Sequence, residues 1–166
     1  MPTRSLVVLA ATVVSLAACT TEDPEPRAGA AADGTRAQVL AAYDGYQRAL
    51  TTALLTGDDE AVALAEFAAE PLLSQTRDSI RQMQEAGVVG QGEQRWSPRV
   101  VELKGTSATI EDCADITQWT VVSIASGEQV PPPPEQPAKF IVTSTAKLLA
   151  GQWSIVSTDG DWTRPC

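Results

Sequence analysis

The chain has 166 residues, carries a formal net charge of −9 and is 43% hydrophobic. This composition is typical of one ordinary globular domain and disfavours a disordered chain, a collagen-like rod or a multi-pass membrane protein. Its 21 acidic against 12 basic side chains repel phosphate backbones, so we expect no nucleic-acid partner. The sequence contains no histidine, which removes the commonest general base, the commonest transition-metal ligand and every Ser-His or Cys-His nucleophile.

Residues 1–18 have the anatomy of a secretory signal, with Arg4 followed by an uncharged apolar run. As a helix that run would be about 20 Å long, too short to span a hydrocarbon core of about 30 Å. Its end, Leu16-Ala17-Ala18-Cys19, resembles the bacterial lipoprotein signal, in which the cysteine receives a diacylglyceryl group. We expect lipidation at Cys19 and, because two acyl chains anchor stably, a place at the extracytoplasmic face of the cell membrane. The alternative is ordinary secretory cleavage beside a chance cysteine.

The segment after the signal predicts a tether. Residues 20–34 lack large apolar side chains and contain two prolines and two glycines. A flexible chain of this length has a root-mean-square span of about 20–25 Å. We therefore divide the chain into a lipidated cysteine with a disordered tether over 19–34 and a single folded domain over 35–166.

Three helices are predicted at the start of this domain. The first, from Thr35 to Thr56, has an apolar stripe at steps of three and four residues. Its members are Val39, Tyr43, Tyr46, Leu50 and Ala53/Leu54. Asp58 or Asp59 can cap a short second helix over Ala61–Ala69. Pro71 suits the first turn of a third helix, which Gly87 ends.

Beyond Gly92 the apolar pattern changes to strand alternation. Arg99–Lys104 and Ser107–Cys113 predict a hairpin with Val101 and Leu103 on one face. Further strands are expected over Thr117–Ala125, Lys139–Leu149 and Gln152–Thr158, with a loop between Gly127 and Pro137. The order predicts an α+β domain, with about three helices on one face of an antiparallel sheet of four to five strands.

Four consecutive prolines, Pro131 to Pro134, lie in that loop. They are an extended candidate ligand for domains with aromatic grooves, but a connection between two strands is the simpler interpretation.

Two cysteines remain besides Cys19. Cys113 and Cys166 form an even pair in a compartment that permits disulfides, and we predict that they are bonded. The bond would close a loop of about 54 residues, for which the chain-entropy model gives about 4 kcal/mol. A reactive thiol or a metal site would need basic neighbours or further ligands that the sequence does not place beside them.

The domain resembles the nuclear-transport-factor-2-like superfamily over residues 35–166. The resemblance rests on Tyr43 and Tyr46 in a long first helix, on helix entry through Pro71, and on two segments that look like small tethered proteins of actinobacterial cell surfaces. These segments are VVELKGTSATIEDCAD from Val100 and GQWSIV from Gly151, with a closing cysteine. The resemblance implies a cone-like fold that encloses a pocket, in a superfamily of isomerases, dehydratases and non-enzymatic binding modules.

Several side chains are candidates for a site in that cone. Tyr43, Tyr46, Trp119 and Trp153 would line a small-molecule pocket if they converge, although such side chains more often form core. Asp112 or Asp115 would be the acid of an isomerase-like centre, although aspartates beside Cys113 more often make turn hydrogen bonds. Neither Glu111 with Asp112 and Asp115 nor Asp159-Gly160-Asp161 has the ligand count or spacing of a calcium loop. We interpret both segments as surface turns. We expect no metal and no cofactor.

Two functions remain. The first is a lipid-anchored, non-catalytic surface module that binds another envelope protein or assembles with itself. The second is a small-ligand-binding or isomerase-like protein that uses the interior of the cone. An exposed apolar patch on the sheet would favour the first, and an enclosed cavity with a converging carboxylate and tyrosine would favour the second.

Overall fold

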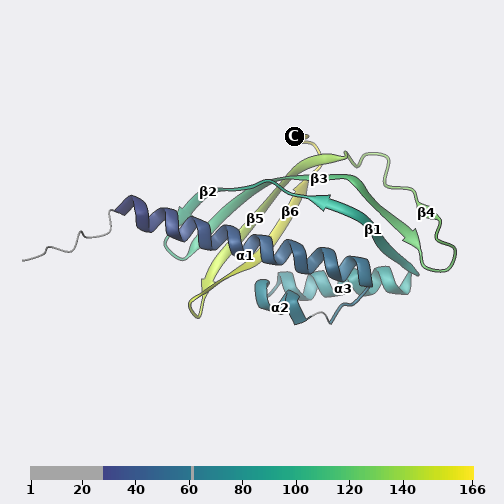
Figure 1. The fold of residues 1–166 in the computed structure, drawn as a ribbon, viewed down its shortest axis with the longest axis horizontal. Coiled ribbons are helices and arrows are strands. Elements are labelled where there is room, and N and C mark those ends of the chain that lie inside the picture. The colour runs from purple at the N-terminus through teal and green to yellow at the C-terminus, as the bar shows by residue number, and fades with distance from the viewer. Residues whose placement is uncertain (1–27, 61) are drawn as a thin grey trace, which may run out of the picture.

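The computed structural model describes residues 28–60 and 62–166 (Figure 1). The helices are α1 (Ala28–Thr56), α2 (Val62–Phe67) and α3 (Leu72–Glu85). The strands are β1 (Val88–Arg95), β2 (Pro98–Lys104), β3 (Ser107–Ser123), β4 (Gln129–Val130), β5 (Lys139–Leu149) and β6 (Gln152–Asp161). The predicted signal, Cys19 and most of the predicted tether lie outside the described residues. No helix in the described part of the chain is long and apolar enough to cross a membrane.

The six strands form one antiparallel sheet in the order β1-β3-β5-β6, and β2 and β4 also pair with β3. The three helices lie on one side of this curved sheet, with α1 running along it (Figure 1). The predicted α+β class is therefore confirmed. The strand number is six rather than four to five, because β1 and the two-residue β4 were not predicted, while two of the five predicted strands form the single strand β3.

The core lies between α1 and the inner face of the sheet. The predicted α1 stripe is correct, since Val39, Tyr43 and Tyr46 are at most 1% exposed. Opposite them lie Ile110 of β3 and Ile155 of β6, both fully buried. The spacing of the apolar side chains along α1 therefore predicts correctly which face of the helix covers the sheet.

Helix α1 begins at Ala28, earlier than the predicted start at Thr35. Residues 28–34, which we expected in the disordered tether, are helical. Alanine has the highest helix propensity, and this segment is rich in it, so the helix extends beyond the stripe that contacts the core.

Strand β1 contains Gly90 and Gly92, which look like turn residues in the sequence. In the structure a Cβ on Gly92 would lie 2.0 Å from the carbonyl oxygen of Gln118, and one on Gly90 would lie 2.2 Å from the Trp119 ring. The glycines are required because β3 approaches β1 closely, so they mark a strand rather than a turn.

Strand β3 is continuous over 17 residues, whereas two strands with a bend near Cys113 were predicted. A bulge replaces that bend, because Glu93 pairs with Gln118 and Arg95 with Asp115. Asp115 accepts a hydrogen bond from the Thr117 N–H at 3.0 Å inside the bulge. The expected local aspartate hydrogen bond is therefore present, but within a strand.

A second bulge changes the inner face of β2. Val100 pairs with Ile110 and Glu102 with Thr109, so Val101 is the extra residue. Val100 and Leu103 pack against the core, and Val101 is 49% exposed. The prediction that Val101 and Leu103 share the buried face was wrong, because strict alternation does not survive an inserted residue.

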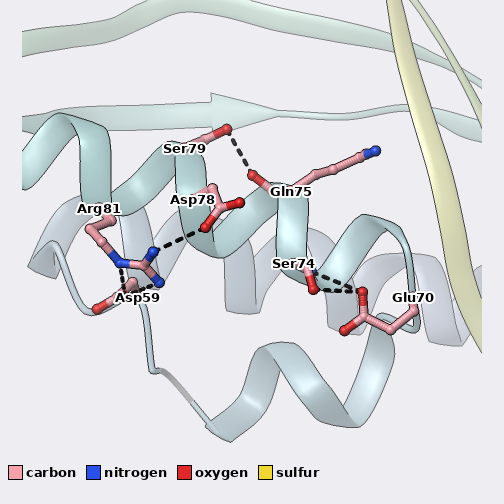
Figure 2. Close-up of polar contacts among 7 residues, drawn as sticks. All are labelled: Asp59, Glu70, Ser74, Gln75, Asp78, Ser79 and Arg81. Atoms are coloured by element: carbon pink, nitrogen blue, oxygen red, sulfur yellow. Dashed lines mark hydrogen bonds and ion pairs between the residues drawn. The ribbon is translucent and has the colours of Figure 1, made fainter.

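Helix α3 is tied to the connection between α1 and α2 by Arg81. Its guanidinium pairs with Asp59 at 3.1 Å and with Asp78 at 3.0 Å, while Ser74 donates to Glu70 at 2.7 Å (Figure 2). Asp58 Oδ1 accepts from the Glu60 N–H at 3.1 Å, in the connection that precedes α2, so the predicted capping of α2 by Asp58 or Asp59 stays a prediction. Asp59 positions α3.

The C-terminal segment is fastened to β3 and β5. The Sγ atoms of Cys113 and Cys166 are 2.10 Å apart, so the predicted disulfide is present and joins residues separated by 53 positions. The Ile141 N–H donates to the Arg164 carbonyl at 3.0 Å, and the Arg164 guanidinium pairs with Glu111 at 3.2 Å. These contacts hold the last residues on the outer face of the sheet.

We expect Cys166→Ser to lower the free energy of unfolding by about 2–4 kcal/mol, because the unfolded chain loses a long closed loop. Urea unfolding with and without reductant measures this. Reductant should destabilise the wild type and leave the Cys113→Ser/Cys166→Ser double variant unchanged. Equal stability of the wild type in both conditions would contradict the prediction.

Candidate functional site

Asp112 and Tyr43 meet between β3 and α1. Asp112 is 1% exposed and Tyr43 is fully buried. The Tyr43 hydroxyl donates to Asp112 Oδ2 at 2.9 Å, and the Ser97 N–H donates to Asp112 Oδ1 at 2.5 Å. Gln47 Nε2 donates to the Tyr43 oxygen at 2.6 Å. Both carboxylate oxygens and the phenol oxygen therefore have protein partners.

Burial dominates the acid–base properties of this pair. It raises the pKa of Asp112, and the hydrogen bonds from Ser97 and Tyr43 offset part of that rise. Burial and the negative charge of Asp112 also raise the pKa of Tyr43. A general base must reach the proton that it removes, but here the carboxylate is occupied by the phenol. The arrangement joins α1 to β3 more directly than it supports acid–base chemistry.

A hollow of about 260 Å³ beside Ser97 and Glu111 approaches Asp112 from the outside. Glu111 pairs there with Arg99 and Arg164, and these two guanidinium groups hold the pKa of the Glu111 carboxyl below its usual range. The hollow is thus bordered by an ion-pair cluster that fastens the C-terminal segment.

The four aromatic residues predicted to line one pocket do not come together. Tyr43, Tyr46 and Trp153 belong to the core and are at most 5% exposed. Trp119 lies apart from them and lines a groove described below. The three core residues lie on the buried faces of α1 and β6, where they pack in the hydrophobic core.

The acidic candidate residues do not form one site either, because each has a different partner. Glu111 faces two arginines, Asp112 faces Tyr43, and Asp115 pairs with Lys139 at 2.9 Å. The Thr117 hydroxyl and the Lys139 ammonium hold the pKa of Asp115 well below its usual range. Among the described residues no three metal-ligating side chains gather. Asp159 and Asp161, which we interpreted as a surface turn, lie in β6 and pair with β5.

We expect Asp112→Asn to lower the free energy of unfolding by about 1–3 kcal/mol near neutral pH. Its amide NH2 must face one of two donors, the Ser97 N–H or the Tyr43 hydroxyl. The pKa of Asp112 in the folded protein is raised above its ordinary value of 3.8, so the folded state binds a proton more tightly than the unfolded state does. The wild type should therefore gain stability relative to the variant as the pH falls from the raised pKa towards 3.8. Urea unfolding between pH 7 and pH 3 measures the difference.

Asp33→Asn on the exposed surface of α1 is the matched control and should change stability by less than about 0.5 kcal/mol at neutral pH. A difference between wild type and Asp112→Asn that stays constant across the pH range would contradict a buried, pKa-raised carboxyl.

A groove of about 460 Å³ opens between the second half of β3 and the proline-rich connection to β5. Ile116, Trp119 and Val121 of β3 form one side of the groove, and Val130 of β4 continues the apolar surface. The other side is mainly proline, contributed by Pro131, Pro132, Pro133 and Pro137. The groove is thus an aromatic and aliphatic surface without an acid–base pair.

The pairing of β3 explains why the groove exists. Its pairing with β5 ends where Asp115 meets Lys139, and its pairing with β4 begins where Val121 meets Val130. Between these points the loop leaves β3, apart from one hydrogen bond from the Ile116 N–H to the Ala138 carbonyl at 2.8 Å. Trp119 is held over Gly90, where only a glycine leaves room for its ring.

The charges beside the groove are uneven. Beyond Thr117 lies a hollow of about 270 Å³ in which Arg95 pairs with Glu93 and Lys139 with Asp115. The proline-rich segment itself carries Glu128 and Glu135 and no basic residue before Lys139. The proline side of the groove is therefore acidic.

Comparison with known proteins concerns the fold. No protein-family model matches the chain, and no curated protein matches it. Among solved structures, the intermembrane-space region of the chloroplast protein ARC6 superposes with a TM-score of 0.55 at 12% identity, over 75% of this chain and 95% of that one. This likeness supports a shared α+β fold and carries no function.

Two further solved structures have the NTF2-like name that the sequence led us to expect. A candidate dehydratase from Streptomyces avermitilis matches with a TM-score of 0.47 at 15% identity, over 76% of this chain and 94% of its own. A protein of unknown function from Shewanella oneidensis MR-1 matches with a TM-score of 0.44 at 9% identity, over 73% and 97%.

Sequence reasoning missed the groove as a unit. It singled out Trp119 as a pocket residue and Pro131–Pro134 as a loop, but it did not bring the two together. The signal was present, because four prolines after a strand prevent that strand from continuing along its neighbour.

Proposed function

We propose that this chain is a lipid-anchored, non-catalytic module of the cell surface that binds another extracytoplasmic protein through the groove between Trp119 and the proline-rich segment. The observation that carries the proposal is the groove itself, an apolar surface bordered by Trp119, Val121 and Val130. Exposed apolar surfaces with a polar rim are typical of interaction sites.

The position of the groove fits an anchored binding module. Helix α1 is 29 residues long, or about 43 Å, and its N-terminal end lies at the opposite end of the molecule from β4 (Figure 1). A chain held at Cys19 would thus present the groove away from its point of attachment.

The closed Tyr43–Asp112 pair favours a binding role over an isomerase-like one. Each group is the hydrogen-bond partner of the other, with both buried. A small-ligand-binding function remains the alternative, because a groove of about 460 Å³ has the size of small-molecule sites, which are typically about 300–1,000 Å³.

The acidic charge beside the groove indicates the chemistry of the partner surface. Glu128 and Glu135 are exposed residues of the segment that contains the groove's prolines, and the chain as a whole carries −9. Opposite charge accelerates association and disfavours wrong partners. The partner surface is therefore apolar at its centre and basic at its edge.

Anchoring is tested by Cys19→Ser. Because the substitution removes the thiol that would be acylated, we expect the protein to move from the membrane fraction to the medium of the cells that make it. Thr20→Ser, which leaves Cys19 intact, should stay with the membrane. Retention of the Cys19→Ser protein in the membrane fraction would contradict a lipid anchor.

The partner is tested by photo-crosslinking in those cells. Benzoylphenylalanine in place of Gln129, at the rim of the groove, should give one defined protein adduct, and the same replacement at Lys147 on the exposed side of β5 should not. The adduct should disappear when Trp119 is replaced by Ser. Absence of an adduct at 129, or equal adducts at both positions, would refute the proposed surface. A stoichiometric small-molecule adduct in native mass spectrometry would instead support the alternative.

A further inference from the structure

We infer that the groove takes an extended peptide segment of the partner, which adds as a short strand to the open side of β3 at residues 117–120. The inference rests on the proposed function and names the kind of segment that the groove binds and the way it is held.

The register of β4 on β3 shows why this side of β3 is open. Val122 pairs with Gln129 and Val121 with Val130. The same register would place Pro131 opposite Thr120, Pro132 opposite Trp119, Pro133 opposite Gln118 and Pro134 opposite Thr117. Proline has no N–H to donate, so the ladder ends where the four prolines begin.

The backbone of Trp119 faces the groove. The Ser123 N–H donates to the Glu128 carbonyl at 2.9 Å, which fixes the side to which the polar groups of Ser123 point. Alternate residues of a strand point the same way, so the N–H and C=O of Val121 and Trp119 point to this side as well. Val121 has Val130 as its partner there, and Trp119 would have Pro132.

In the part of the chain that the structure describes, no backbone hydrogen bond joins residues 117–120 to the proline-rich loop between β4 and β5. The open donor and acceptor of Trp119 are the groups that an added strand would satisfy. The loop cannot extend the pairing with β3 to Trp119 itself, because the residues opposite are prolines, which have no N–H to donate.

The dimensions fit a short peptide. The open stretch, residues 117–120, corresponds to about 14 Å of strand at 3.4 Å per residue. The groove of about 460 Å³ has Trp119 and Val121 on its apolar surface. A segment of about five residues with apolar side chains at alternate positions would therefore contact that surface and pair with Trp119 at the same time.

The acidic residues of the proline-rich segment indicate which side chains the bound peptide has at its ends. Glu128 lies at the start of the proline-rich segment and Glu135 lies near its end. Basic side chains at both ends of the bound peptide would face these carboxylates. Proline at its centre would be excluded, because the centre must donate an N–H to the Trp119 carbonyl.

The probe is the labelled peptide acetyl-Lys-Val-Thr-Val-Thr-Val-Lys-amide, whose central valine would lie opposite Trp119 with all three valines on the same face as the Trp119 and Val121 side chains. Its control is the same peptide N-methylated at the central valine. Binding to the lipidated full chain in detergent is measured by fluorescence anisotropy. We expect N-methylation to weaken binding at least tenfold, because it removes the donor without changing the side chains. Equal affinity of the two peptides would overturn strand addition.

A closed-groove variant tests the same inference from the side of the protein. Pro131→Thr, Pro132→Val, Pro133→Thr and Pro134→Val together restore the missing N–H groups, so β4 should extend along β3 and peptide binding should be lost. Ile124→Ser, an exposed apolar residue outside the groove lining, is the matched control and should bind as the wild type does. Undiminished binding by a folded closed-groove variant would overturn the inference, and the N-methylated peptide still decides if that variant does not fold.

The outcomes separate this inference from the proposed function. If the peptides fail to bind while the adduct at position 129 forms, strand addition is wrong and the partner docks on the groove in another way. If the adduct is also absent, the proposed function fails with it. If sedimentation shows a dimer that the closed-groove variant loses, the occupant is a second copy of this chain rather than a partner, which also overturns the inference.

Discussion

Strand β3 is the element on which the rest of the structure depends. It runs for 17 residues and pairs with β1, β2, β4 and β5, so most of the sheet is organised along its two edges. A strand of this length accumulates twist, and the bulge near Asp115 bends it further. Its first half, with β2 and β5, forms the covered face over the core. Its second half, with β1 and β4, extends to the groove at Trp119.

The interior and the groove follow different physical rules. In the interior the Tyr43–Asp112 hydrogen bond satisfies two buried polar groups with each other at the junction of α1 and β3. At the groove, prolines prevent such mutual satisfaction along β3. The fold therefore pairs the buried polar groups of the interior with each other and leaves part of the β3 edge without a paired strand.

Elements that depend on local patterns were predictable. The stripe from Val39 to Ala53 chose the buried face of α1, and the alternation in Lys139–Leu149 matches the bounds of β5. The pairing of Cys113 with Cys166 was predicted because these two cysteines remain once Cys19 is assigned to the expected lipoprotein signal, and the structure contains the bond. Each of these predictions uses a repeat or a count that the surrounding structure does not alter.

Elements that depend on neighbouring strands were not predictable. Gly90 and Gly92 look like turn residues, and only the nearness of Trp119 and Gln118 shows that they belong to a strand. The alternation of the sequence predicts that Val101 is buried, but the bulge in β2 leaves its side chain exposed. The four aromatic candidates were expected to line one pocket if they converged, but three of them lie in the core and Trp119 lines the groove.

The sequence by itself determined the α+β class, the order of the helices and most of the strands, and the disulfide, because periodicity, turn residues and cysteine number are local or countable properties. Only the tertiary structure decided that Asp112 is hydrogen-bonded to Tyr43 and that Trp119 and the prolines line one groove. Those relations join residues 69 positions apart in one case and loop to strand in the other. Strand register and bulges set such contacts, and a shift of one residue would reverse them.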